Sequence, residues 1–115
     1  MKLEDLVEKI VIDPRKLTHY ALDLNAPHGR HKAILFEKLL GFTKESHTEL
    51  LQQLQTQSLH AEAFFHSEDQ FGKRYTVDVE VRGIKEGQQA TVRTGWLVPV
   101  GVNTAHLVTL YVMRR

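Results

Sequence analysis

A short basic segment, from His28 to Lys32, carries residue types that can handle a phosphate group. His28, Arg30, His31 and Lys32 stand where a turn leads into a helical pattern. Amides at a helix N-terminus favour anions, and nearby cations add to that attraction. A neutral imidazole accepts a proton and its protonated form returns one, so the segment suits general acid–base chemistry at neutral pH. A surface turn with a chance pair of histidines explains the same residues equally well.

A second set of polar residues is expected on the outer face of a sheet. Alternation along the second half of the chain places Gly95 among these residues, where the missing side chain lets a ligand approach the backbone. The set suits an anion-binding surface, although polar residues also cover the ordinary solvated face of an antiparallel sheet. Its members are Arg74, Thr76, Arg93, Thr109 and Tyr111.

Metal and cofactor chemistry find little support in the sequence. His28 and His31 stand three residues apart and could share a helical face, but no further His, Asp or Glu follows at a companion spacing. The chain also lacks a phosphate-binding loop, a dinucleotide glycine fingerprint, a nucleophile elbow and a zinc-protease helix. We therefore expect no metal site and no cofactor.

Composition predicts one globular domain, residues 1–115, in the cytoplasm. The chain of 115 residues has 42% hydrophobic and 25% charged residues and no cysteine, which suits a reducing compartment. Lys and Arg number 15 and Asp and Glu 14, a net charge of +1, so nucleic-acid binding would need a local patch. No apolar run resembles a signal peptide or a membrane span, and we expect no membrane partner.

Helical spacing dominates residues 1–60. The spacing of Leu3, Leu6, Val7 and Ile10 predicts a short N-terminal helix. Asp13-Pro14 is typical of a helix start. Gly41 suits the left-handed position after a helix, and Thr43 can cap the next one. The predicted helices cover residues 3–10, 14–21, 30–40 and 44–57, with buried stripes that include Leu17, Tyr20, Ala21, Leu35, Phe36, Leu39, Leu40, Leu50, Leu51 and Leu54.

Residues 61–115 change to the two-residue period of strands. Strands are predicted around Phe64 and Phe65 and over residues 74–81, 90–98 and 107–113, about four in all. Helices followed by sequential strands favour an α+β fold, with the helices packed on one face of an antiparallel sheet. The residues expected to face the core are Tyr75, Val77, Val79, Val81, Val92, Thr94, Trp96, Val98, Val108, Leu110 and Val112.

Several blocks of the chain together resemble a known family. They run in one order from about Val11 to Val112: Lys16-Leu17 with Tyr20, residues 29–33 with Phe36 and Leu40-Gly41, residues 72–78, 90–96 and 107–112. In this order they resemble the small bacterial domain of unknown function numbered 6883. That family is similar to C-terminal domains of polymorphic and contact-dependent toxins, and its stand-alone members resemble toxins encoded beside a small antitoxin-like protein.

The resemblance implies a metal-independent ribonuclease of the barnase, colicin and RelE group, in which an open sheet face holds RNA. It implies that Lys32 and Arg93 balance the phosphate charge, that His28 or His31 transfers protons, and that Thr109 and Tyr111 position the substrate. Arg30, Arg74 and Thr76 would complete the binding surface. The segment before Lys32 is shorter here than is usual in the family, which leaves the match of His28 open. A non-catalytic module that docks a small cognate protein is the alternative, and an open strand edge could also pair with a second copy.

Overall fold

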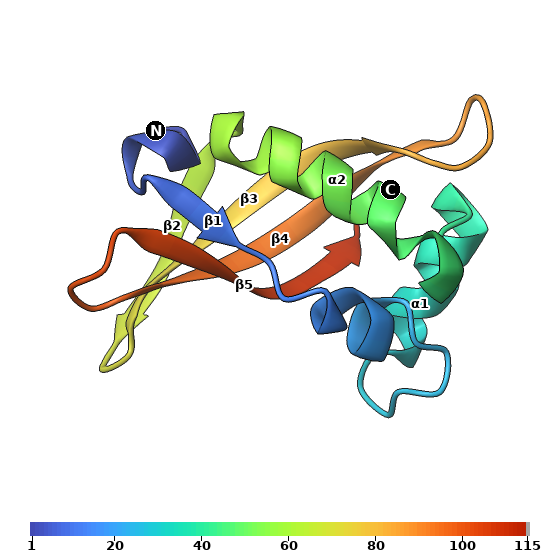
Figure 1. Cartoon of the computed structure of the whole chain (residues 1–115), viewed down its shortest axis with the longest axis horizontal. Coiled ribbons are helices and arrows are strands. Elements are labelled where there is room, and N and C mark those ends of the chain that lie inside the picture. Colours follow the sequence, from blue (N-terminus) through green and yellow to red (C-terminus); the bar gives the residue numbers. More distant parts are fainter. Residues whose placement is uncertain (115) are drawn as a thin grey trace.

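The computed structural model has the predicted α+β architecture (Figure 1). It describes residues 1–114, so the predicted domain end, Arg115, lies outside the described residues. Within residues 1–114 every helical segment precedes the four strands that begin at Ala63, as the change of period predicted. The helical segments are η1 (Leu3–Asp5), η2 (Leu17–Ala21), α1 (Arg30–Leu35), η3 (Phe36–Leu40), η4 (Lys44–Ser46), α2 (His47–Gln57) and η5 (Ser58–His60). The strands are β1 (Lys9–Val11), β2 (Ala63–Asp69), β3 (Gly72–Arg82), β4 (Gln89–Pro99) and β5 (Thr104–Val112).

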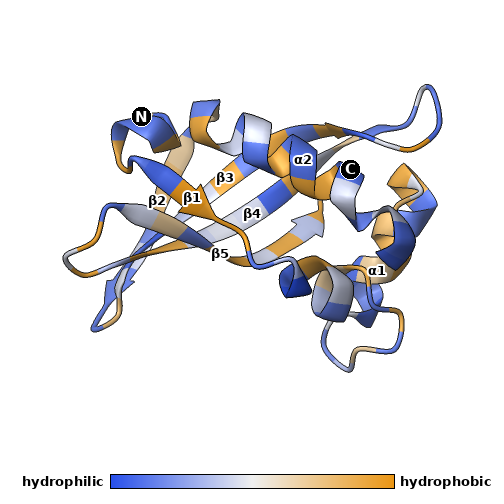
Figure 2. Cartoon of the chain, viewed as in Figure 1, coloured by the Kyte–Doolittle hydropathy of each residue, from blue (hydrophilic) through white to orange (hydrophobic). Residues whose placement is uncertain are grey.

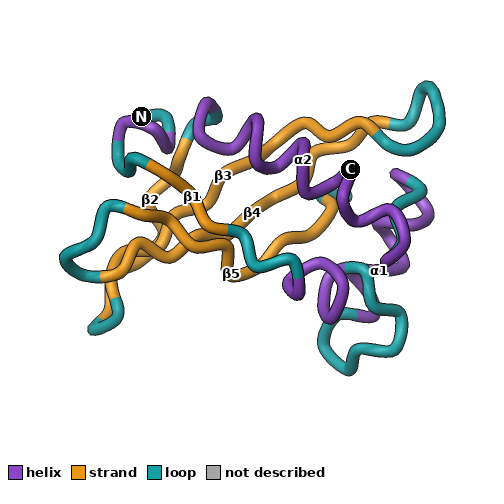
Figure 3. The backbone as a smooth tube through the Cα atoms, in the orientation of Figure 1, coloured by secondary structure: helices purple, strands orange, loops and turns teal. Residues whose placement is uncertain are grey.

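The described strands form one sheet of five strands in the order β1-β5-β4-β3-β2. Consecutive strands from β2 to β5 pair antiparallel, and β3 pairs with β4 along its whole length, from Gly72↔Pro99 to Arg82↔Gln89. Strand β1 pairs parallel with β5, which makes the sheet mixed. The four antiparallel strands predicted from sequence are present, but the prediction of about four strands in the sheet is corrected to five. The fifth strand, β1, comes from the half of the chain predicted to be helical (Figure 3).

The N-terminal helix predicted over residues 3–10 is wrong. Only Leu3–Asp5 is helical, and Lys9–Val11 extends along β5. A helix of two turns is marginal in water on its own. The β-branched residues Ile10 and Val11 favour a strand, and the edge of β5 provides its hydrogen-bonding partner. Leu3 and Val7 are buried all the same, so the apolar pattern was correct and its geometry was not.

Helix α2 packs across one face of the sheet and forms the core with it (Figure 1). Leu50 and Leu54 of the predicted stripe are fully buried, while Leu51 is partly exposed. Apolar and polar residues alternate along the strands (Figure 2). The apolar members face α2 and include Val77, Val79, Val81, Val92 and Trp96. The opposite face of β3, β4 and β5 is therefore free of α2.

The helical segment that begins at Arg30 and ends at Leu40 has the predicted bounds. Helix α1 continues into η3, and Gly41 follows with a φ of 73°, the left-handed conformation that glycine adopts without strain. Phe36 and Leu40 enter the core, whereas Leu39, predicted to be buried, is 37% exposed. Near the C-terminal end of β5, α1 places its N-terminal turn beside the face that α2 leaves open.

A β-bulge changes the predicted alternation in β5. Gly95 pairs with Thr109 and Trp96 with Leu107, so Val108 is an extra residue on the β5 side. Leu107 consequently takes the buried position that the sequence assigned to Val108, which is only partly buried. Beyond the bulge, Leu110 and Val112 are buried and Thr109 and Tyr111 lie on the other face, as predicted.

No helix in residues 1–114 is both long and apolar enough to cross a membrane.

Trp96 is the largest fully buried side chain, and its indole N–H has a partner in the core. It donates to Thr94 Oγ1 at 2.7 Å, and the Thr94 hydroxyl in turn donates to the carbonyl oxygen of Val77, also at 2.7 Å. A buried threonine between two apolar residues of β4 is thereby explained, because an unpaired indole N–H in the core is costly.

Replacing Thr94 by valine should lower the free energy of unfolding by about 1–3 kcal/mol, because the indole N–H of Trp96 then stays buried without an acceptor. Urea denaturation of Thr94→Val measures this cost. The same change in a Trp96→Phe background should cost less, since no indole N–H remains. Equal costs in both backgrounds would show that the Trp96–Thr94 bond contributes nothing.

Candidate functional site

The open face of the sheet carries two adjacent rows of polar residues. Strand register places Asp78, Arg93 and Tyr111 side by side on β3, β4 and β5. The next row consists of Thr76, Gly95 and Thr109. Because side chains alternate between faces, both rows point away from α2. The predicted outer face therefore exists.

Lys32 of α1 reaches this face from outside the sheet. Its ammonium group donates hydrogen bonds to the hydroxyl of Tyr20, on η2, and to Thr109 Oγ1, the latter at 2.9 Å. The Nζ atom also lies 4.5 Å from the ring centroid of Tyr20 and 5.7 Å from that of Tyr111, within range of cation–π attraction. One of its three N–H groups remains for a ligand. Within residues 1–114 no carboxylate lies at ion-pair distance from Lys32.

Two local features bring Lys32 and Tyr20 together. Asp13 accepts a hydrogen bond from the backbone N–H of Arg15 at 3.0 Å, which starts the turn into η2 and supports the predicted start at Asp13-Pro14. Gly29, directly before α1, packs against the backbone of Tyr20 so closely that a Cβ there would lie 2.1 Å from the carbonyl oxygen of Tyr20. Only glycine permits this approach, which sets α1 beside η2.

Lys32, Tyr20, Thr109 and Tyr111 together form the Lys32 cluster. The bulge at Val108 positions the part of this cluster that lies on the sheet. It shifts the register of β5 by one residue just before Thr109, so that Thr109 faces Gly95 across the pair and Lys32 above it. A Cβ at Gly95 would contact Thr109 Cγ2 at 3.0 Å, so the glycine leaves room for the threonine side chain. Bulges often re-aim a side chain beside functional sites.

Arg93 is held in place by Asp78. Its Nε and Nη2 atoms donate to the two carboxylate oxygens at 2.9 and 3.0 Å. The hydrogen bond to Asp78, and to a smaller extent one to Tyr111, raises the pKa of Arg93 above its ordinary value. The guanidinium is therefore charged at every practical pH. This fork uses two of the five N–H donors and leaves three for Tyr111 or a ligand. Asp78 balances the charge of Arg93, whereas Lys32 has no such partner among residues 1–114.

The phenol of Tyr20 ionises more easily than an ordinary tyrosine. Partial burial by itself opposes ionisation, but hydrogen bonds to Lys32 and Thr109 and the positive charge of Lys32 outweigh it, so the pKa of Tyr20 is lowered. Tyr20 is therefore a possible proton acceptor in contact with the cation that lowers its pKa.

A hollow of about 470 Å³ lies on the open face beside the cluster. It contains five residues predicted from sequence, and His66 of β2 joins them. Arg74 at its edge is paired with Asp69 at 3.2 Å. The predicted residues that line it are Arg74, Thr76, Arg93, Thr109 and Tyr111.

The basic segment from His28 to Lys32, which runs into α1, is only partly gathered at the site. Lys32 turns toward the sheet, but Arg30 lines a separate hollow with Pro27 and Ile34. His28 and His31 are exposed, and the hydrogen bonds and ion pairs within residues 1–114 do not join either to the cluster. Successive helical residues point about 100° apart, so Arg30, His31 and Lys32 cannot all face one surface.

Three residues at the site were missed by sequence reasoning. Tyr20 was predicted to lie in a buried stripe, and neither Asp78 nor His66 was among the predicted site residues. The alternation gave the correct face for Asp78, but its pairing with Arg93 depends on strand register. No local signal links Tyr20 with Lys32, twelve residues later.

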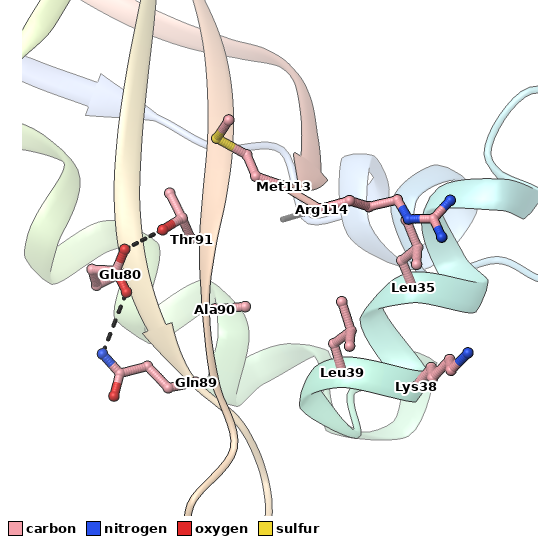
Figure 4. Close-up of a pocket in the computed structure, with 9 residues that line it drawn as sticks. All are labelled: Leu35, Lys38, Leu39, Glu80, Gln89, Ala90, Thr91, Met113 and Arg114. Carbon is pink, nitrogen blue, oxygen red and sulfur yellow. Dashed lines mark hydrogen bonds between the residues drawn. The ribbon is translucent and has the colours of Figure 1, made fainter.

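A second hollow, of about 490 Å³, lies beyond the row of Asp78, Arg93 and Tyr111. Leu35 and Leu39 point into it from the helical side, and both carboxylate oxygens of Glu80 are bonded, to Thr91 and to Gln89 (Figure 4). Its lining includes the cations Lys38 and Arg114 but also the carboxylate of Glu80, which repels an anion. No carboxylate is among the described residues that line the first hollow, so the first hollow suits an anion better. No group of three His, Asp or Glu residues within 1–114 could hold a metal ion.

Replacing Gly29 by alanine should lower the free energy of unfolding by about 1–3 kcal/mol, because the new Cβ would overlap the backbone of Tyr20. It should also separate Tyr20 from Lys32 and raise the pKa of the Tyr20 phenol. Urea denaturation and ultraviolet titration of the tyrosines measure the two effects. His28→Ala, at an exposed neighbouring position, is the control and should change neither. An unchanged Gly29→Ala protein would contradict the close contact.

Comparison with known proteins finds one family. The family model described as "Domain of unknown function (DUF6883)" matches residues 2–114. No curated protein and no solved structure matches the chain significantly. The match covers nearly the whole chain, including η2, α1 and every strand that builds the open face. The chain therefore belongs to the DUF6883 family.

Proposed function

We propose that this protein is a metal-independent endoribonuclease that binds RNA on the open face of its sheet. The observation that carries the proposal is the ammonium group of Lys32, which no carboxylate within residues 1–114 balances and which lies between Tyr20, Thr109 and Tyr111. A cation held by neutral groups attracts a phosphate, and Arg93 on the adjoining strand adds a second positive group.

The proposed reaction is attack of a ribose 2′-oxygen on the adjacent phosphorus. The 2′-hydroxyl gives up its proton, the new P–O bond forms, and the bond to the 5′-oxygen of the next nucleotide breaks. The leaving oxygen takes up a proton, so the products are a 2′,3′-cyclic phosphate and a 5′-hydroxyl. Lys32 and Arg93 would stabilise the negative charge that develops on the phosphorane, which is the largest contribution in many such sites.

Tyr20 is our proposed proton acceptor. Its lowered pKa makes the phenol oxygen easier to ionise. Its hydrogen bond to Lys32 keeps that oxygen beside the group that would hold the phosphate. Proton transfer was predicted from sequence for His28 or His31, and in the proposed reaction one of these two histidines protonates the leaving oxygen. Thr109 and Tyr111 would position the substrate, and Arg74, Thr76 and Arg30 would contact it further along.

The biological role that we propose is that of a toxin in a bacterial toxin–antitoxin or related system. This part depends on the resemblance of the family to toxin domains, and it predicts a small cognate antitoxin-like protein that covers the open face. A second candidate function is a non-catalytic module that docks such a partner. It is favoured by β2, an edge strand whose Phe64 and Phe65 are 58% and 60% exposed.

Substitution of the two cations should separate these candidates. Lys32→Ala and Arg93→Ala should each lower the rate of RNA cleavage roughly 100-fold, because each removes a charge contact to the phosphorane. The assay uses purified protein with transfer and messenger RNA in the presence of a chelator. Lys38→Ala, an exposed cation on the same helical segment, is the matched control. A wild-type protein that leaves RNA intact would refute the ribonuclease and leave the docking module.

The pH dependence of cleavage should reveal Tyr20. A lowered pKa means that the phenolate forms below the ordinary tyrosine value of about 10, so the rate should rise with pH and level off before that value. Tyr20→Phe should abolish this rise, and Lys32→Ala should move it to higher pH. A profile that Tyr20→Phe leaves unchanged, but that His28→Ala or His31→Ala alters, would assign the base to histidine instead.

A further inference from the structure

Phe64 places an aromatic ring on the same open face, at the far side of the sheet. It pairs with Thr76 across β2 and β3, and Ala63, the residue before it, is buried opposite Val77. Alternation therefore puts Phe64 on the face of Thr76, away from the core. Phe64 is 58% exposed, so its ring is accessible to a ligand.

A continuous row links Phe64 to the Lys32 cluster. Register connects Phe64 with Thr76, Thr76 with Gly95, and Gly95 with Thr109, which accepts the hydrogen bond of Lys32. Gly95 adds no side chain at the middle of this row, and the hollow on the open face is lined there by Thr76, Gly95 and Thr109. His66 and Arg74, which line the hollow, flank the row on the side of β2 and β3.

We propose that Phe64 is a stacking site for an unpaired nucleobase of the RNA whose phosphate lies at Lys32. This rests on the proposed function, since it assumes RNA on the open face. Three strand spacings separate Phe64 from Thr109, about 14 Å, so the stacked base belongs to a nucleotide further along the strand than the one that reacts. An aromatic ring beside a cationic groove is the usual arrangement for binding single-stranded nucleic acid.

The chemistry of the row favours a single strand over a duplex. Bases in a double helix stack on one another and offer no free face to a protein ring, whereas unpaired bases do. Stacking on phenylalanine is tolerant of base identity because every base has a flat π face. The site would therefore extend the RNA contact without reading its sequence.

Phe65 supplies a matched control within the same strand. It is 60% exposed, almost as much as Phe64, but it lies on the opposite face, where its ring contacts Tyr75 edge-on with centroids 5.9 Å apart. Phe64→Ala and Phe65→Ala thus remove the same exposed group from the two sides of one edge strand. Phe64→Tyr keeps a ring that can stack.

The test measures binding of a fluorescent single-stranded hexanucleotide in which fluorine replaces each 2′-hydroxyl, so that cleavage cannot occur. Phe64→Ala should weaken binding about 10-fold. Phe65→Ala and Phe64→Tyr should bind like the wild type. A dinucleotide of the same chemistry is too short to reach Phe64 from Lys32, so its affinity should be the same for Phe64→Ala and the wild type. Circular dichroism checks that each variant is folded.

The outcomes separate this proposal from the proposed function. Equal hexanucleotide affinity of Phe64→Ala and wild type would overturn the stacking site alone, because RNA binding would persist. Failure of the wild type to bind RNA would overturn both proposals. A wild-type dimer that Phe64→Ala dissociates, with RNA affinity unchanged, would assign the ring to a second copy of the chain instead.

Discussion

The contact of Lys32 with Tyr20 and Thr109 joins three separate parts of the molecule. One hydrogen bond spans 12 residues of sequence and the other 77, so a single ammonium group ties α1 to η2 and to β5. Both bonds are partly buried, which shields them from competing water. Because both partners are hydroxyl groups, the contact fixes the lysine without cancelling its charge.

The two cations of the site are prepared in different ways. Arg93 lies in a fork with Asp78, which orients the guanidinium and balances its charge. Lys32 is oriented by neutral hydroxyls and two aromatic rings and keeps its full attraction for an anion. A site of this kind has little net charge to repel its own folding, yet it concentrates positive potential at one atom. That agrees with a chain whose overall charge is only +1.

Small backbone features make this arrangement possible. Gly29 lets the start of α1 touch the backbone of Tyr20, and the bulge at Val108 turns Thr109 toward Lys32 while returning Leu107 to the core. Helix α2 lies on the other face, where Leu50 and Leu54 pack into the core together with Phe36 and Leu40 of η3. The fold thus separates the face that stabilises the sheet from the face that is available to a ligand.

The sequence by itself determined the α+β class, the helical segment from Arg30 to Leu40, the inward position of Trp96 and the open-face position of Arg93 and Tyr111. These follow from local periodicity, which reports which way a side chain points. Only the tertiary structure decided that Lys9–Val11 forms a strand, that Val108 is a bulge, and that Tyr20 rather than His28 or His31 contacts Lys32. The reason is that strand pairing and helix docking are set by contacts between distant segments, to which a local pattern is blind.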